Sequence, residues 1–492
     1  MTASDSASSD SPPHDRRRWL GLAVLVMAQF IVILDGAIVN VALPSLQTAL
    51  GFSGESLHWV ITAYAITFGG LLLLGGRLAD NLGRRRMFVA GVSVFTVASL
   101  LNGLAWDDLS LVGFRALQGV GAALLTPAAL SLLVSTFTDT RERNLALGIW
   151  GAAVGSGGAA GLLLGGVLTE LDWRWIFFIN VPLGVGAIAL APLVVRESRA
   201  DGAARSFDVA GALTSVGGLG LLVYGLTHAA EHGFGTATTG ALLGGAVALL
   251  GAFVAIEARS QAPLLPLRLF RLRTLSGSNV AMVLASGSAF VVFLLGTLYM
   301  QQVLHYSPLQ TGAAFLAVTA TILLVAGPVQ SLVGRVGVRP LMPVGFLIMA
   351  AGVAWMARMP LDGSYLTDLF PGLVAMGFGS ALVFVPGQIG AQRGVSGSDA
   401  GVASGLINTS QQIGGAIGVA LATTISTTFS GDWAAAHPAA TADAALTHGF
   451  GAAFLVFAGV LVAAAGITAL LVEREPEGAA AGHDQLPVHA LG

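Results

Sequence analysis

The chain has 492 residues, of which 55% are hydrophobic and only 10% are charged, and its mean hydropathy is +0.80. Soluble globular domains carry about 25% charged residues, so this composition excludes a soluble globule and indicates a membrane protein. The absence of cysteine excludes disulfides and thiol nucleophiles, and a net charge of −3 does not favour a nucleic-acid partner.

The chain opens on residues 1–18, which are rich in serine, proline and aspartate, end on three arginines and predict a disordered tail. About fourteen apolar stretches of roughly 20 residues follow, each long enough to cross the hydrocarbon core as a helix. The first continues beyond the length of a signal peptide and is expected to stay uncleaved. The predicted spans lie near residues 19–43, 59–79, 87–105, 109–133, 145–168, 176–195, 208–229, 239–257, 276–300, 310–332, 340–358, 369–391, 401–427 and 449–472.

Arginine is unevenly distributed between the connections on the two sides. With the N-terminus inside, the outer connections contain only Arg174 and Arg358. Because cytoplasmic connections are enriched in basic residues, this pattern predicts a multi-pass protein of the cell membrane with both termini in the cytoplasm. The inner connections contain Arg84, Arg85, Arg86, Arg141, Arg143, Arg196, Arg199, Arg205, Arg259, Arg268, Arg271, Arg273, Arg335, Arg339 and Arg393.

The first span contains a carboxylate in the run LDGAIVNVALP, at Asp35. A charge at bilayer depth costs on the order of 3 kcal/mol, so it is tolerated mainly where it is buried and useful. Arg115 in the fourth span is its expected partner: both residues lie about 10–12 Å from the outer surface at 1.5 Å per residue. We interpret the pair as a proton-coupling site; the alternative is a permanent ion pair that only joins two helices.

Two loops at opposite ends of the chain resemble each other. GGRLADNLGRRR follows the second span and SLVGRVGVRP follows the tenth, with Leu78, Gly83 and Arg85 aligned to Leu332, Gly337 and Arg339. Repeated halves are typical of transporters whose site lies at the interface between the halves. We therefore predict an all-α protein with a six-helix bundle at 19–200, two inserted helices and a linker at 201–272, a second six-helix bundle at 273–472 and a tail at 473–492.

These motifs together resemble the major facilitator superfamily, specifically its fourteen-span drug:proton antiporters. LDGAIVNVALP is similar to that family's first-span motif and GGRLADNLGRRR to the superfamily signature after the second span. RALQGVGAALLTPAAL resembles the fourth-span motif, and WRWIFFINVPLG the start of the sixth span. The resemblance implies that Gly76, Asp80, Gly83 and Arg84 form a cytoplasmic latch. The alternative is that the arginines only set the orientation and Gly83 only ends a helix.

The fifth span contains glycines at intervals of four, among them Gly157, Gly161 and Gly165. Such spacing places small residues on one helix face and predicts close helix packing. The matching antiporter motif has a proline where this chain has Leu162, so the resemblance is weaker here and a proline kink is not expected.

Polar residues inside spans are candidates for the lining of a substrate cavity. They either hydrogen-bond a substrate or join neighbouring helices, and the sequence does not separate the two roles. No acid is evident within the last six spans, which favours a neutral, zwitterionic or monocationic solute. These candidates are Asn40, Gln118, Asn408, Gln411 and Gln412.

We predict no metal site and no cofactor, because the histidines are dispersed and no phosphate-binding glycine run ends in lysine. The predicted function is proton-coupled export of a small amphipathic organic compound, such as a drug or antibiotic. A metabolite transporter, working in export or uptake, is the first alternative. A membrane sensor without transport is the second; it is expected to carry a soluble output domain, which neither predicted tail resembles.

Overall fold

The structure is a computed structural model that describes residues 15–54, 56–199, 208–233, 235–260, 263–395 and 400–473. Within these ranges the chain forms helices and no strands. The predicted tails at 1–18 and 473–492 lie outside the described residues, except for residues 15–18 and 473. Residues 15–18 belong to the first turn of a helix, because the helical backbone begins ahead of the apolar run.

Thirteen helices in these ranges are long and apolar enough to cross a membrane, and a shorter apolar helix of 16 residues completes the predicted set of about fourteen. The helices are α1 (Asp15–Leu50), α2 (Trp59–Leu82), α3 (Arg84–Gly103), α4 (Asp108–Thr136), α5 (Thr140–Leu171), α6 (Trp175–Phe178), α7 (Asn180–Val194), α8 (Val209–His232), α9 (Ala237–Arg259), η1 (Leu267–Arg271), α10 (Arg273–Leu298), η2 (Tyr299–Val303), α11 (Pro308–Val336), α12 (Leu341–Met356), η3 (Tyr365–Leu369), α13 (Phe370–Gly390), α14 (Ala400–Ala436) and α15 (Ala442–Leu471). The short α6 and α7 form one crossing together.

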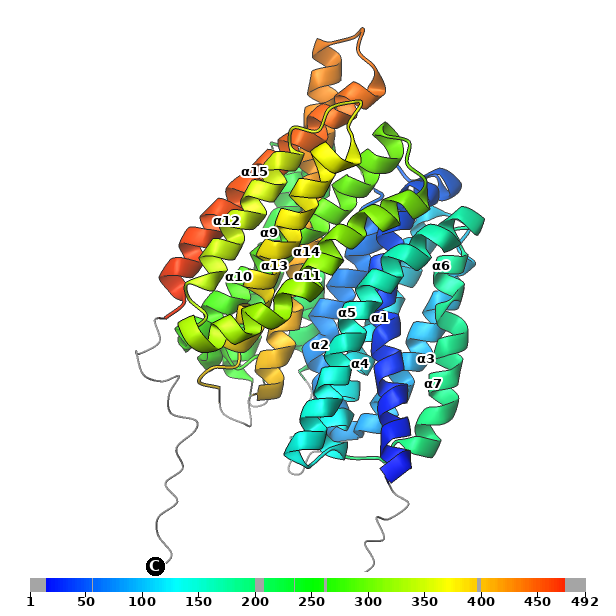
Figure 1. Cartoon of the computed structure of the whole chain (residues 1–492), viewed down its shortest axis with the longest axis vertical. Helices are drawn as coiled ribbons and strands as arrows, with labels where there is room; N and C mark the ends of the chain where they lie inside the picture. The colour runs from blue at the N-terminus through cyan, green and yellow to red at the C-terminus, as the bar shows by residue number, and fades with distance from the viewer. Residues whose placement is uncertain are drawn as a thin grey trace, which may run out of the picture.

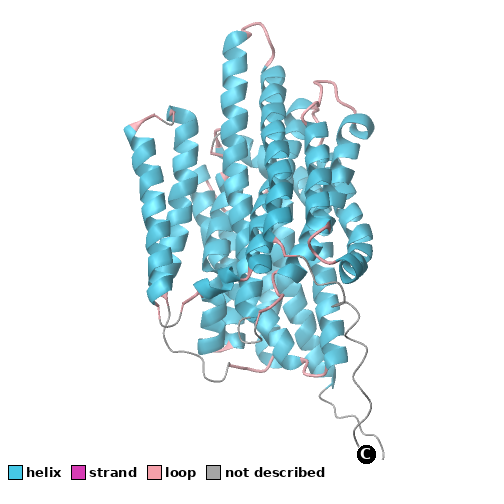
Figure 2. Cartoon of the chain, turned by 90° about the vertical axis from the view of Figure 1, so that its left-hand side faces the viewer, coloured by secondary structure: helices cyan, strands magenta, loops and turns pink. Residues whose placement is uncertain are grey.

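Two helices extend well beyond the predicted spans. α14 continues to Ala436 and α15 begins at Ala442, and their hairpin projects past the other helices at the top of Figures 1 and 2. The projecting part is held by aromatic stacking, with the ring of Trp433 4.4 Å from that of His437 and 5.6 Å from that of His448. The prediction from apolar length did not include this hairpin, because its sequence is more polar than the spans and it can be helical outside the membrane.

The helices form two bundles, which lie side by side in Figure 1. α1 to α7 pack mainly on one another and so do α10 to α15, whereas α8 and α9 form a hairpin that contacts α2 and α14 through α8. This arrangement confirms the predicted fold of two six-helix bundles with two inserted helices. α1 begins at the lower right of Figure 1, and α15 runs downward and ends at the left edge of the molecule. We call the end of the bundles at which α1 begins and α15 ends the terminal end.

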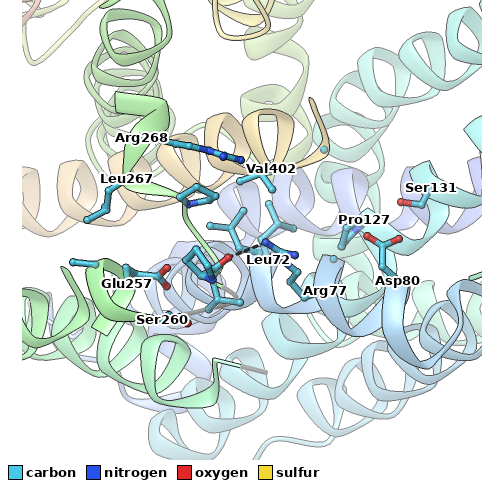
Figure 3. Close-up of a pocket in the computed structure, with 18 residues that line it drawn as sticks. Leu72, Arg77, Asp80, Pro127, Ser131, Glu257, Ser260, Leu267, Arg268 and Val402 are labelled. Carbon is cyan, nitrogen blue, oxygen red and sulfur yellow. Dashed lines mark hydrogen bonds between the residues drawn. The ribbon is translucent and has the colours of Figure 1, made fainter. Parts of the chain in front are cut away.

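The seam between the bundles is closed at the far end, opposite the terminal end. A methyl group on Gly312 of α11 would lie 2.2 Å from the carbonyl oxygen of Leu162 in α5, so the two backbones touch. Gln301 also donates a hydrogen bond of 2.8 Å to the carbonyl of Val41 across the seam. At the terminal end, by contrast, a cavity of about 730 Å³ lies between α2, α4, α9 and α14 (Figure 3).

Candidate functional site

The carboxylate of Asp35 is completely buried in α1 and is surrounded by donors. Its Oδ2 accepts a hydrogen bond of 2.6 Å from Nη1 of Arg115, with which it forms an ion pair. Its Oδ1 accepts bonds of 2.8 Å from the Gln118 amide and 2.9 Å from the Asn180 amide. The structure thus brings together Asp35 and Arg115, which the sequence placed at similar depth.

Arg115 is buried as well, with 1% of its surface exposed, and two of its guanidinium nitrogens donate hydrogen bonds. Nε donates to the carbonyl of Val60 at 2.9 Å, and Nη1 also donates to Gln118 Oε1 at 2.6 Å. The guanidinium lies 4.4 Å from the centre of the Tyr64 ring, a cation–π contact that strengthens when water is excluded. Such geometry is what a buried charge pair needs if its attraction is to offset the cost of removing it from water.

A second layer of polar groups orients Gln118. Its Oε1 accepts a hydrogen bond of 2.8 Å from the Asn102 amide, and its Nε2 lies 2.8 Å from the Ser99 hydroxyl. Both partners come from α3, so the network connects α1, α3, α4 and α7. A change in the charge of Asp35 therefore reaches most of the first bundle through hydrogen bonds.

The start of α4 sets the depth of Arg115. Asp107 caps this helix by accepting a bond of 2.8 Å from the Ser110 amide, and Ser110 returns the contact. The hydrogen bonds from Ser110 hold the pKa of Asp107 below its ordinary value. Arg115 lies two turns into the helix that begins here, as 3.6 residues per turn require.

Glycines let neighbouring backbones approach the network. A methyl group on Gly119 would lie 2.1 Å from the Thr67 hydroxyl, so α4 and α2 are in direct contact beside Arg115. On the other side of Asp35, the glycine face of α5 packs on α1: a methyl group on Gly161 would lie 2.8 Å from the Leu34 carbonyl oxygen. At Gly157 and Gly165 the corresponding closest distances to α1 are 3.2 and 3.0 Å. These glycines lie where close packing was predicted.

A cavity of about 290 Å³ lies between the two bundles next to this network. Its wall is mostly apolar and aromatic, with a few polar groups, and Arg115 contributes to it whereas Asp35 lies behind. The hydroxyl of Tyr64, which also lines the cavity, has no hydrogen-bond partner among the described residues. The aromatic and polar side chains in the wall are Tyr64, Phe68, Phe290, Phe293, Asn40, Thr319, Gln412 and Arg115.

Of the five residues proposed from sequence as cavity lining, Asn40 and Gln412 are part of the wall. Gln118 lies instead in the network behind it. Gln411 points to Met282, 3.5 Å from its sulfur, and Asn408 bonds to the Ser404 carbonyl of its own helix at 2.9 Å. The physical reason is the helix period: adjacent residues point about 100° apart, so Gln411 and Gln412 cannot share one face.

Across the turn between α2 and α3, Arg84 at the start of α3 donates hydrogen bonds of 2.9 and 3.1 Å to Asp80 in the last turn of α2. Gly83 has a φ of +117°, a conformation that favours glycine, and a methyl group there would lie 2.9 Å from the Glu197 carboxylate. Glu197 in turn accepts a 3.0 Å bond from the Arg85 amide, which ties the loop to the end of α7. Gly76 lines the large cavity at the terminal end, beside Asp80.

Sequence reasoning missed Asn180, Asn102, Ser99 and Tyr64, which complete the network. Each is a polar or amphipathic residue inside an apolar run, and that was the available signal. It is a weak signal, because such residues commonly bond within their own helix, as Asn408 does.

The sequence pattern of the Major Facilitator Superfamily matches residues 25–419 and, in a second match, residues 278–490. The chain is 42% identical to the puromycin resistance protein pur8 of Streptomyces alboniger over 482 residues, which cover 96% of this chain and 95% of that protein. It is also 42% identical to the cephamycin export protein CmcT of Amycolatopsis lactamdurans over 400 residues, 80% of this chain and 82% of that one. The lincomycin resistance protein of Streptomyces lincolnensis is 35% identical, over 88% of this chain and 89% of the relative.

Solved structures share the fold. A bacterial homologue of the human lysosomal transporter Spinster, in an inward-facing and unoccupied conformation, superposes with a TM-score of 0.66 at 16% identity. It covers 93% of this chain and 97% of that one. The POT family transporter PepTSo gives a TM-score of 0.66 at 15% identity, covering 92% of this chain and 97% of that one. The chain is a multi-pass membrane protein, and it belongs to the major facilitator superfamily.

Proposed function

We propose that this chain is a proton-coupled secondary transporter that exports a small amphipathic organic compound, such as an antibiotic, across the cell membrane. The observation that carries the proposal is the fully buried ion pair of Asp35 and Arg115 beside a cavity between the two bundles. Intramembrane ion pairs of this kind are typical of proton pathways in transporters. The names of the relatives, which include antibiotic resistance and export proteins, support the direction of transport.

Protonation of Asp35 would remove the negative charge that holds Arg115. The guanidinium would then keep its bonds to Val60 and Gln118 but lose its counter-ion. A buried charge without a counter-ion is unfavourable, so a rearrangement of the bundle would become favourable. Each proton that enters provides about 2.3 kcal/mol per 100 mV of membrane potential and about 1.4 kcal/mol per pH unit. One or two protons per cycle are therefore enough to maintain a useful outward gradient of substrate.

The basic residues favour an orientation with the terminal end in the cytoplasm. Arg84, Arg85 and Arg86 lie at this end, whereas Arg174 and Arg358 lie at the far end, and cytoplasmic ends are the arginine-rich ones. In that orientation the structure is open to the cytoplasm and closed to the outside. We further propose that Asp80 and Arg84, now paired with each other, act as a latch that gains contacts with the second bundle when the cytoplasmic side closes.

The cavity favours an amphipathic substrate without strong charge. Phe68, Phe290 and Phe293 provide flat apolar surface, while Asn40 and Gln412 provide hydrogen-bonding groups. A few polar groups in a mostly apolar wall fix the orientation of a ligand without a strong charge requirement. A metabolite transporter built on the same fold is the alternative, and the choice of compound in the experiment separates the two.

The test uses inside-out membrane vesicles that carry an imposed proton gradient and puromycin as the first compound. Addition of puromycin should release protons through the wild-type protein, and Asp35→Asn should abolish the release while the protein still reaches the membrane. Asp172→Asn is the matched control, because Asp172 is a half-exposed carboxylate that pairs with Arg174 at the far end. Undiminished proton release by Asp35→Asn would contradict the proposal.

A further inference from the structure

A pair of carboxylates, Asp208 and Glu257, is buried outside the network of Asp35, at the terminal end of the inserted hairpin. Asp208 caps α8 and accepts a hydrogen bond of 2.7 Å from the Gly211 amide. Glu257 belongs to the last turn of α9 and accepts a bond of 3.0 Å from the Leu265 amide. Only 8% of Asp208 and 3% of Glu257 is exposed.

The two carboxyl groups face each other across Gly211. A methyl group at Gly211 would lie 3.0 Å from Asp208 Oδ1 and 3.0 Å from Glu257 Oε1, so these two oxygens are at most about 6 Å apart. Asp208 Oδ2 and Glu257 Oε1 are buried and have no hydrogen-bond partner among the described residues. Each acid therefore has one oxygen that no described residue satisfies.

Among the described residues, no ion pair joins a cation to either acid. Arg77 of α2 is the cation that faces Glu257 (Figure 3), but it donates to the carbonyl of Pro263 at 2.8 Å and forms no ion pair within 4.0 Å in the described residues. Asp80, also on α2, is held by Arg84, and Arg268 of η1 lines the same cavity. Asp208 and Glu257 differ in this respect from Asp35, whose carboxylate has a guanidinium nitrogen at 2.6 Å.

Two ionised carboxylates within about 6 Å of each other, buried and without an ion pair in the described part of the chain, repel each other, and each loses hydration at its unsatisfied oxygen. A single proton between them removes the repulsion and turns one unsatisfied oxygen into a donor. We propose that Asp208 and Glu257 form a second proton-binding site, which holds one proton in the conformation seen here.

The site is connected to the mouth of the cavity through the linker after α9. Glu257 holds this linker at Leu265 and Arg77 holds it at Pro263. Further along, Leu265 and Leu269 pack in one apolar cluster with Ala403 and Leu406 of α14. The linker therefore bridges α2 of the first bundle and α14 of the second. With the proton bound, the pair has a single negative charge and the linker stays docked. Loss of the proton as the pH rises doubles that charge. The two carboxylates then repel each other, which favours movement of Glu257 and undocking of the linker that it holds at Leu265.

A proton-binding site can be detected in the protein without a transported compound. Infrared spectra of the purified full-length protein are recorded from mildly acidic to mildly alkaline pH, in the region of the protonated carboxyl stretch. The wild-type protein should show a band that disappears at alkaline pH, and Glu257→Gln and Asp208→Asn should each lose it. Asparagine still caps helices, so Asp208→Asn preserves the start of α8.

Glu197→Gln is the matched control, since Glu197 is a partly buried carboxylate at the same end of the molecule that lies 3.8 Å from Arg86 and 3.9 Å from Arg85. It should leave the band unchanged. Retention of the band in Glu257→Gln overturns the proposal, and so does its loss in Glu257→Gln alone, which would assign the proton to Glu257 without Asp208.

Because the protein has no cysteine, spin labels at Ser131→Cys and Leu267→Cys can follow the linker. The distance between the two labels should grow with pH in the otherwise unchanged protein, and it should stay constant when Glu257→Gln or Asp208→Asn is added.

Discussion

The two bundles share their loop geometry. Gly83 in the first bundle and Gly337 in the second both have positive φ, +117° and +79°. Two residues later, Arg85 donates to the carbonyl of Val195 at 3.3 Å, and Arg339 donates to that of Ala469 at 2.9 Å. In both cases an arginine from the loop binds the carbonyl end of the last helix of its own bundle, where a cation is favourable. The repeat seen in the sequence is therefore a structural repeat.

The interiors of the bundles differ. The first contains a buried ion pair and its network, whereas every buried polar side chain in the described part of the second is an uncharged serine, threonine or asparagine. The second is instead rich in buried methionine, for example Met282, Met342, Met349 and Met356. Methionine is flexible and adapts to irregular shapes. We propose a division of labour, with proton chemistry in the first bundle and, in the second, an uncharged wall for substrate made of Phe290, Phe293, Thr319 and Gln412. The buried methionines are not part of that wall and belong to the core of the second bundle.

Removing the charges from the first bundle should have the largest effect on the difference between the two bundles. Asp35→Asn leaves Arg115 buried and unpaired, which should destabilise the protein by about 3–5 kcal/mol and abolish proton-coupled export. The double variant Asp35→Asn/Arg115→Gln removes both charges and should recover much of the stability without recovering transport. Thermal unfolding in detergent and proton release from vesicles measure the two effects. Export by the double variant would show that the ion pair is structural only.

Arg115→Lys should have the next largest effect, because it keeps the charge but not the geometry. The three donors of lysine lie on a single nitrogen, which cannot occupy both the position of Nε beside the Val60 carbonyl and that of Nη1 beside Asp35. We expect a loss of about 2 kcal/mol of stability and strongly reduced coupling. Proton release per exported molecule is the decisive measurement, and unchanged coupling would mean that charge alone is sufficient.

How far the sequence predicts this site depends on the kind of signal. Asp35 and Arg115 were predictable because a charge in an apolar run is expensive and helix rise places both at one depth. Asn180 and Asn102 were not, since their role depends on how the helices rotate about their axes, which apolar length does not determine. Glu257 was missed for a different reason: it lies at the end of a span, where an acid is usually hydrated, and only the packing of the linker buries it.

The fold was predictable almost in full, because the length of each apolar span and the arginines beside it can be read from a short stretch of sequence. The exceptions are segments held by tertiary contacts, such as the α14–α15 hairpin with its stacked Trp433 and His437. The domain boundaries at 200 and 272 stay predictions, since the linker residues beside the first of them lie outside the described ranges.

Gly161→Ala tests whether the close packing of α5 on α1 supports the proton site of the first bundle. Its new methyl group would lie 2.7 Å from the Ala37 methyl and 2.8 Å from the Leu34 carbonyl oxygen, so α5 would push α1 at the position of Asp35. Overpacking of this kind costs about 1–3 kcal/mol. Gly151→Ala, on the same helix with nothing within 4 Å, is the control: it should leave export unchanged and should not lower thermal stability, because alanine favours the helix more than glycine does. Equal behaviour of the two variants would argue against a close α1–α5 contact.

The smallest effect is expected in the second bundle and should depend on the compound. Gln412 lines the cavity, whereas its neighbour Gln411 points to Met282. Gln412→Ala should weaken the apparent affinity for a compound that hydrogen-bonds there by about fivefold, the equivalent of one neutral hydrogen bond of about 1 kcal/mol, and leave other compounds unaffected. Gln411→Ala should change none of them. The measurement is the concentration dependence of proton release for puromycin, lincomycin and a cephamycin, with the number of protons per molecule constant throughout. A change in that number in Gln412→Ala would place part of the proton chemistry in the second bundle and end the division of labour between the two.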